Sequence, residues 1–305
     1  MLTHALLLVL GLALLTGGGE MLVRGASALA TSLGVSPLVV GLTVVAFGTS
    51  APALAVNVAA AVDGKGDISF GNIVGSSIAN IGLIVGATAL VRPLAVHRTV
   101  ILREIPMMLL AAAATLVLCL DGLLDGRADA FTRLDGVVLL LFFAVFLYYT
   151  VNDALRQRGG PRKEDEQRGR PTPVRDVLLI AIGLGGLIAG GKLTVDAAVE
   201  LARAVGVSEV VIGLTVVAIG TSLPELVTAI IASARGQADL ALGNVTGSNI
   251  FNLLFVLGIT ATIQPIDIPP SGHIDLLVMA ALTVTVLPLS INPHRRMGRP
   301  AGIVL

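Results

Sequence analysis

Residues 41–53 read Gly-Leu-Thr-Val-Val-Ala-Phe-Gly-Thr-Ser-Ala-Pro-Ala, and residues 213–225 read Gly-Leu-Thr-Val-Val-Ala-Ile-Gly-Thr-Ser-Leu-Pro-Glu. The two stretches lie 172 residues apart (213 − 41) and agree at 10 of 13 positions. The same offset carries Gly-Asn-Ile-Val-Gly-Ser-Ser-Ile-Ala-Asn at 71–80 onto Gly-Asn-Val-Thr-Gly-Ser-Asn-Ile-Phe-Asn at 243–252. An offset that stays constant over this length indicates an internal duplication.

The composition predicts a protein that crosses a membrane several times. Of the 305 residues, 55% are hydrophobic and 13% are charged, whereas a soluble domain carries about 25% charged residues. The net charge is zero, which argues against a nucleic-acid partner and leaves the lipid bilayer as the expected surroundings. Apolar runs long enough for the roughly 20 residues of a membrane-spanning helix occur at 4–30, 37–62, 69–91, 102–120, 134–153, 176–202, 209–234, 241–264 and 274–291.

These runs predict two copies of a five-helix unit. Residues 1–153 form the first copy, residues 154–175 a linker loop, and residues 176–305 the second copy. Residues 299–305 look like the start of a tenth helix that is either absent or truncated. Because five is odd, the second copy enters the membrane upside down relative to the first. Basic residues are concentrated on the side of the linker, which predicts a cytoplasmic loop, an outside N-terminus and a location in the cell (inner) membrane.

Polar residues inside the apolar runs mark a candidate cation site. Each copy places Gly, Thr, Ser and Pro within a span, which predicts a broken helix that lines a polar site. In the second copy Glu225 follows Pro224 directly, beside the hydroxyl of Ser222. Such hard oxygen ligands suit Na⁺ or Ca²⁺ rather than Zn²⁺. A charge in mid-membrane costs at least about 2.5 kcal/mol, which favours a functional carboxylate over one neutralised by a proton or a local hydrogen bond.

Two asparagines repeat the pattern. Asn80 and Asn252 each follow a serine, Ser76 or Ser248, by four residues, so serine and asparagine share a helix face in both copies. The alternative is that these side chains only form hydrogen bonds between helices.

The first span of each copy contains one pair of opposite charges. Glu20 precedes Arg24 by four residues, and Lys192 precedes Asp196 by four residues. We interpret both as self-neutralising pairs near a membrane boundary rather than as binding sites.

With these motifs the chain resembles the sodium/calcium exchanger family of the calcium/cation antiporter superfamily, in its prokaryotic form with two alpha repeats. The resemblance implies an all-α integral membrane fold of two inverted five-helix repeats, and a secondary antiporter that alternates access to ions bound at mid-membrane between the repeats. It implies transported Na⁺ and Ca²⁺ and no cofactor. It implies cation ligands at Ala46, Thr49, Ser50, Ser76, Asn80, Ala218, Thr221, Ser222, Glu225, Ser248 and Asn252. Glu225, Thr221 and Thr49 are the expected metal ligands, with Ala46, Ala218 and the two threonines acting partly through backbone carbonyls.

The sequence departs from the family pattern at Ala53, where a carboxylate is expected. Asn57, one turn further on, is the polar residue nearest to that helix face. A site with one carboxylate leaves Ca²⁺ with a net charge but neutralises a monovalent cation. The alternative functions are therefore a monovalent-cation or proton-coupled antiporter, or a degenerate homologue that transports calcium weakly. We find no nucleophile–base pair in the spans that predicts an enzyme, and we set a channel aside in favour of an antiporter.

Overall fold

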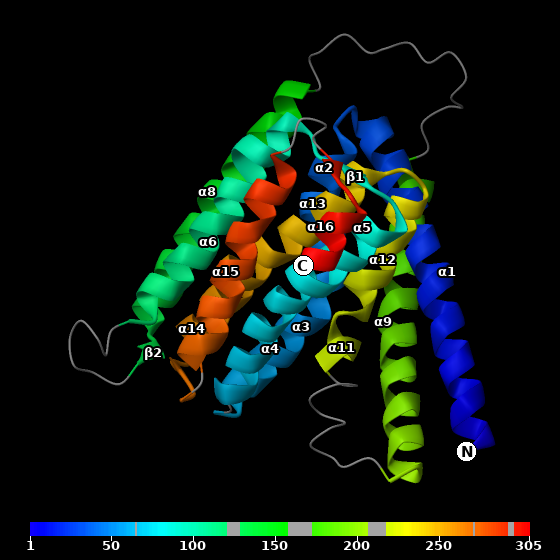
Figure 1. Ribbon diagram of the computed structural model, residues 1–305, viewed down its shortest axis with the longest axis horizontal. Helices are drawn as coiled ribbons and strands as arrows, with labels where there is room; N and C mark the ends of the chain where they lie inside the picture. The colour runs from blue at the N-terminus through cyan, green and yellow to red at the C-terminus, as the bar shows by residue number, and fades with distance from the viewer. Residues whose placement is uncertain (65, 121–128, 158–172, 207–217, 271, 292–295) are drawn as a thin grey trace. The chain divides into compact units, whose positions relative to one another are not determined.

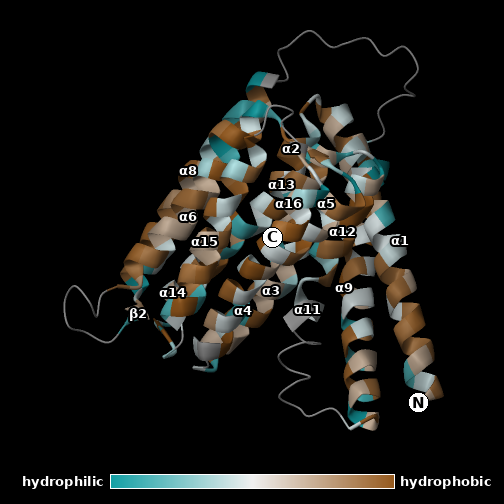
Figure 2. Ribbon diagram, in the orientation of Figure 1, coloured by the Kyte–Doolittle hydropathy of each residue, from teal (hydrophilic) through white to brown (hydrophobic). Residues whose placement is uncertain are grey.

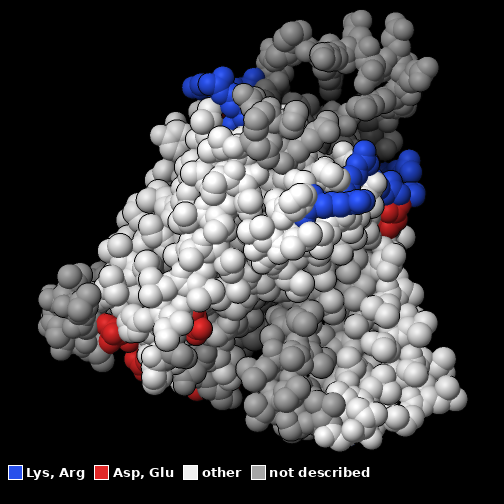
Figure 3. Space-filling view, in the orientation of Figure 1, with Lys and Arg blue, Asp and Glu red and all other residues white. Residues whose placement is uncertain are grey.

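The computed structural model describes residues 1–64, 66–120, 129–157, 173–206, 218–270, 272–291 and 296–305 (Figure 1). Eight of its helical segments are long and apolar enough to cross a membrane, and each overlaps a span expected from the sequence. Hydrophobic residues predominate along helices such as α1 and α8 (Figure 2), and charged side chains are sparse on the face drawn in Figure 3. The protein is therefore a multi-pass membrane protein.

The chain divides into two compact units, each built from both sequence copies. The first unit comprises Met1–Thr49 and Tyr148–Asn244, and the second comprises Ser50–Leu147 and Val245–Leu305. The division runs through helices α3 and α13, both of which carry the repeated motifs. The predicted ligands therefore fall into two sets, one in each unit.

The described segments that contribute to the first unit are mostly long helices with π-helical turns, which are labelled η. They are α1 (Leu2–Leu33), α2 (Pro37–Val40), η1 (Gly41–Val45), the start of α3 (Ala46–Val62), the end of α8 (Arg133–Gln157), α9 (Pro173–Ala204), α11 (Ala218–Thr221), α12 (Leu223–Ala234) and the start of α13 (Ala238–Ile250).

The second unit contains the remaining parts of α3, α8 and α13 together with shorter helices and two-residue strands. These are α4 (Gly66–Ala79), η2 (Asn80–Val85), α5 (Gly86–Val91), β1 (Leu94–Ala95), η3 (Val100–Glu104), α6 (Ile105–Leu118), β2 (Ala130–Phe131), η5 (Phe251–Val256), α14 (Leu257–Ile263), β3 (Ile266–Asp267), α15 (Gly272–Ser290), β4 (Arg296–Met297) and α16 (Arg299–Val304). Strand β1 pairs antiparallel with β4, and β2 with β3.

Helices α1 and α9 pack side by side along a seam of glycines (Figure 1). A Cβ atom at Gly18 would lie 2.7 Å from the backbone nitrogen of Leu187, and one at Gly190 would lie 2.7 Å from that of Leu15. The two backbones are therefore in direct contact, as is common where small residues line membrane helices. Since Gly11 faces Gly190 and Gly18 faces Gly183, the helices are antiparallel.

The antiparallel arrangement of α1 and α9 can be compared with the internal duplication of the sequence. Helices α1 and α9 are the first spans of the two copies, because the offset of 172 carries residues 4–30 onto 176–202. Equivalent helices that cross a membrane in opposite directions are what an inverted repeat requires.

Candidate functional site

The predicted ligands of the first unit lie on α3, α11 and α12. Ala46 and Thr49 are buried in α3, Ser222 and Glu225 are buried near the start of α12, and Thr221 is exposed at the end of α11. The backbone of Ala218 begins α11, and residues 207–217, where the second motif starts, lie outside the described residues.

The helix of the second copy is broken, as the sequence predicts. Helix α11 ends at Thr221, and α12 begins at Leu223 with Pro224 in its first turn. Ser222 stands between them with backbone angles φ −99° and ψ 4°. Glu225, only 5% exposed, lies in the first turn of α12. Its side chain therefore lies at the end of α12 that carries the positive end of the helix dipole.

In the first copy, the prediction of a broken helix is wrong. Helix α3 continues through Pro52 to Val62. The irregularity lies earlier, in the π-helical turn η1. A proline inside a helix removes one hydrogen bond to the carbonyl four residues back, here that of Gly48. This loss does not interrupt α3, whereas in the second copy the helix already changes direction at Ser222, before its proline.

Asn244 connects the ligand helices of the two copies within the first unit. The Thr49 hydroxyl contacts Asn244 Oδ1 at 3.4 Å, and Asn244 Nδ2 donates to the backbone carbonyl of Glu225, also at 3.4 Å. Asn244 is fully buried, and its side chain spans the space between α3 and α12. The sequence prediction did not include it among the site residues, although the repeated Gly-Asn pair was visible.

A close approach of two backbones places Asn244 between α3 and α12. A Cβ atom at Gly243 would lie 2.7 Å from the carbonyl oxygen of Leu38, and one at Gly41 would lie 2.8 Å from that of Leu240. Helix α13 thus rests directly against the beginning of the second span. Only glycine allows this distance, and the next side chain after Gly243 is that of Asn244.

The second unit holds the other predicted ligands. Ser50, Asn80, Ser248 and Asn252 are buried, and Ser76 is half-buried, with its hydroxyl 3.3 Å from Asn72 Oδ1. Within the described part of the chain, several buried oxygens have no hydrogen-bond partner: Oδ1 of Asn57, Asn80, Asn249 and Asn252, and Oγ of Ser248. An unsatisfied polar group in hydrocarbon costs several kcal/mol, so oxygens of this kind are candidates for cation binding.

π-helical turns occur at the same place in both copies. Turn η2 begins at Asn80, and turn η5 (Phe251–Val256) includes Asn252. A π-turn inside an α-helix often marks a functional position, since it is less stable than a regular turn. The two turns thus support the choice of these two asparagines from the sequence.

A second buried carboxylate was missed by the sequence prediction. Glu104, at the end of η3, accepts a hydrogen bond from Arg103 Nε at 2.7 Å and is fully buried. The adjacent guanidinium compensates the charge of the Glu104 carboxylate.

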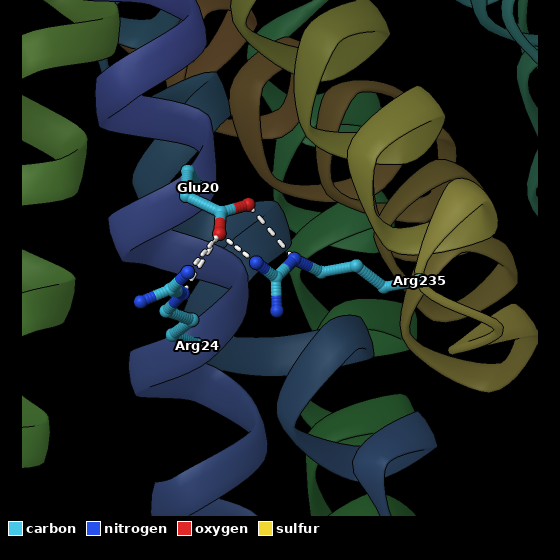
Figure 4. Close-up of polar contacts among 3 residues, drawn as sticks. All are labelled: Glu20, Arg24 and Arg235. Atoms are coloured by element: carbon cyan, nitrogen blue, oxygen red, sulfur yellow. Dashed lines mark hydrogen bonds and ion pairs between the residues drawn. The ribbon is translucent and has the colours of Figure 1, made fainter.

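Glu20 forms the ion pair expected with Arg24 and a second one with Arg235, at the end of α12 (Figure 4). Arg24 Nε donates to Glu20 Oε1 at 2.7 Å, and Arg235 Nε donates to Glu20 Oε2 at 2.8 Å. The carboxylate therefore links α1 to α12 inside the first unit.

Comparison with known proteins identifies relatives of this chain. The sequence profile described as sodium/calcium exchanger protein matches residues 3–152 and 176–305. The chain belongs to the sodium/calcium exchanger family. It is 39% identical over 282 residues to a protein named CaxA from Alkalimonas amylolytica, with 92% of this chain and 87% of the relative covered. It is 33% identical to the sodium/calcium exchanger MaX1 of Methanosarcina acetivorans, with 86% and 84% covered.

The structure is similar to that of the sodium-calcium exchanger NCX_Mj, with a TM-score of 0.84 and 32% identity over 99% of this chain and 94% of the other. The exchanger fold with two repeats, expected from the sequence, is thereby confirmed. The protein is a cation antiporter of this family, and the alternatives of a monovalent or proton-coupled antiporter and of a degenerate homologue are not favoured.

Proposed function

We propose that the protein exchanges Na⁺ for Ca²⁺ across the cell membrane, as a transporter without enzymatic activity. The observation that carries this proposal is the carboxylate of Glu225, buried at the break between α11 and α12 in a chain of the sodium/calcium exchanger family. In membrane transporters, broken helices of this kind supply free carbonyl groups and an anionic side chain to a cation.

We propose that both sets of predicted ligands bind the transported cations. The first set includes Glu225 and Thr49, which the side chain of Asn244 connects. The second set comprises Ser50, Ser76, Asn80, Ser248 and Asn252. The side-chain oxygens of Asn80, Ser248 and Asn252 have no hydrogen-bond partner among the described residues. Carboxylate oxygens and neutral oxygens are both ligands that Ca²⁺ and Na⁺ prefer.

The experiment is Na⁺-gradient-driven Ca²⁺ uptake into proteoliposomes that contain the full chain. We expect uptake by the unmodified protein and its loss in Glu225→Gln, which keeps the shape of the side chain and removes its charge. The control is Thr115→Val, because the hydroxyl of Thr115 only donates to Ala111 in its own helix. Equal uptake by Glu225→Gln, or no uptake by the unmodified chain, would overturn the proposal.

We further propose that the N-terminus lies outside and the loop 154–175 inside, with residues 1–153 and 176–305 as the two functional repeats. The asymmetry of basic residues supports this orientation. Protease digestion of sealed, right-side-out vesicles should remove a tag at the N-terminus and leave a tag within the loop intact. The opposite pattern would reverse the orientation.

A further inference from the structure

Asn57 is a buried amide in the part of α3 that belongs to the second unit. Its side chain is 1% exposed, and its Nδ2 donates to the backbone carbonyl of Ala53 at 2.7 Å. This contact fixes the orientation of the amide, because exchanging nitrogen and oxygen would place two acceptors against each other. The oxygen Oδ1 is therefore held on the other side of the amide.

Asn57 Oδ1 has no donor among the described residues. Asn80 and Asn252 have the same property, and both are predicted cation ligands in the same unit. Since hydrocarbon offers no water to a buried acceptor, such an oxygen requires another electropositive partner. A cation that binds there meets this requirement, and oxygen is the ligand atom that Na⁺ and Ca²⁺ prefer.

The position of Asn57 on the helix relates it to the missing carboxylate. Residues four and seven apart share a face of an α-helix, so Asn57 lies on the face of Ala53 and Ser50. Side chains of a helix lean towards its N-terminus, which brings the Asn57 amide over the turn that contains Ala53, in agreement with the hydrogen bond between them. By the same lean, a carboxylate at residue 53 would extend over the turn that contains Ser50, so the Asn57 amide lies about one turn from that place on the same helix face.

The two copies of the repeat complement each other at these positions. The offset of 172 pairs Ala53 with Glu225, and Asn57 with Ala229. In the first copy the apolar residue, Ala53, comes first and the amide, Asn57, follows four residues later. In the second copy the carboxylate, Glu225, comes first and the apolar Ala229 follows.

We propose that Asn57 Oδ1 is a ligand of the transported cation, a neutral oxygen on the face of α3 that also carries Ser50 and Ala53. The inference rests on the proposed exchange function. Within the second unit, Asn57 adds a further neutral oxygen to those of Asn80, Ser248 and Asn252.

The test compares Asn57→Leu, which has a similar volume and no oxygen, with Asn57→Asp, which keeps an oxygen, and with the control Thr115→Val. In proteoliposomes we expect the half-saturating Ca²⁺ concentration of Asn57→Leu to rise about tenfold. The value for Asn57→Asp should lie below that of Asn57→Leu, and Thr115→Val should match the unmodified chain. An unchanged value in Asn57→Leu would overturn the proposal.

Thermal unfolding of the detergent-purified chain separates a ligand from a structural residue. Without Na⁺ or Ca²⁺, Asn57→Leu should unfold at or above the temperature of the unmodified chain, because an unsatisfied acceptor has been removed. The rise in unfolding temperature on adding CaCl₂ or NaCl should be smaller in the variant. A lower unfolding temperature without cations, together with an unchanged cation-induced rise, would assign Asn57 a structural role only.

The same measurements distinguish failure of the inference from failure of the exchange function. If the unmodified chain takes up no Ca²⁺, or if Glu225→Gln is as active as the unmodified chain, the exchange function fails. The cation-induced rise in unfolding temperature then still decides whether Asn57 binds a cation.

Discussion

The Thr49 hydroxyl, from the first copy of the repeat, contacts Oδ1 of Asn244, from the second copy, at 3.4 Å. The same amide donates to the backbone of Glu225. One neutral side chain therefore fixes the distance between two predicted ligands that come from different copies.

We expect Asn244→Leu to reduce the rate of Ca²⁺ uptake roughly tenfold, as is usual when a residue that orients ligands is lost. The backbone of Glu225 and the hydroxyl of Thr49 would each lose a partner. Uptake assays at saturating and limiting Ca²⁺ check this. The equivalent residue of the first copy is Asn72, which is half-buried and contacts Ser76 in its own helix, so Asn72→Leu should have the smaller effect. A larger effect at Asn72 would contradict the bridging role of Asn244.

Introducing the missing carboxylate should strengthen calcium binding. Ala53→Glu adds a carboxylate, a ligand that Ca²⁺ prefers, on the face of α3 that carries Ser50. We expect the half-saturating Ca²⁺ concentration to fall by about tenfold, equivalent to about 1.4 kcal/mol. The matched control is Ala53→Gln, which has the size without the charge. An equal fall in the half-saturating Ca²⁺ concentration in Ala53→Glu and Ala53→Gln would show that the added charge does not cause it.

Gly17 and Gly18, two neighbouring glycines of α1, should respond in opposite ways to replacement by alanine. A Cβ atom at Gly18 would lie 2.7 Å from a backbone nitrogen of α9, whereas one at Gly17 would meet no atom within 4 Å. We expect Gly18→Ala to destabilise the protein by about 1–3 kcal/mol. Gly17→Ala should be neutral or stabilise it by up to about 1 kcal/mol, since alanine favours helices. Thermal unfolding in detergent measures both, and similar values for the two variants would argue against the close packing.

The ion pairs of Glu20 with Arg24 and Arg235 should contribute little to stability, because all three side chains are partly exposed. Glu20→Gln should cost no more than about 1 kcal/mol. The cost should shrink as NaCl is raised from low to high concentration, because salt screens exposed charges. A cost above about 2 kcal/mol that persists at high salt would instead indicate a buried, essential link between α1 and α12.

The sequence predicted the spans and the repeats because both depend on local properties, namely apolar length and a constant offset. Glu225 could be selected for the same reason, since a carboxylate inside an apolar run is visible without a structure. Asn244 could not be distinguished from its repeat equivalent Asn72, because the partners that decide its role come from two other helices, α3 and α12. The continuity of α3 through Pro52 was also hidden, since the same residue pattern accompanies a break in the second copy.

The π-helical turns have a geometric consequence for the polar side chains that follow them. In a regular α-helix, residues eight positions apart differ by about 80° in direction, because each residue turns the helix by about 100°. The extra residue that a π-turn absorbs removes about 100° from that sum, so Asn80 and Thr88 differ in direction by only about 20°. The same holds for Asn252 and Thr260, and both threonines are buried and donate to the carbonyl four residues back. A helical wheel drawn through either span with a constant period therefore assigns every residue after the turn to the wrong face. Deletion of one residue within the turn would restore the regular period and keep Thr88 or Thr260 near the direction of its asparagine.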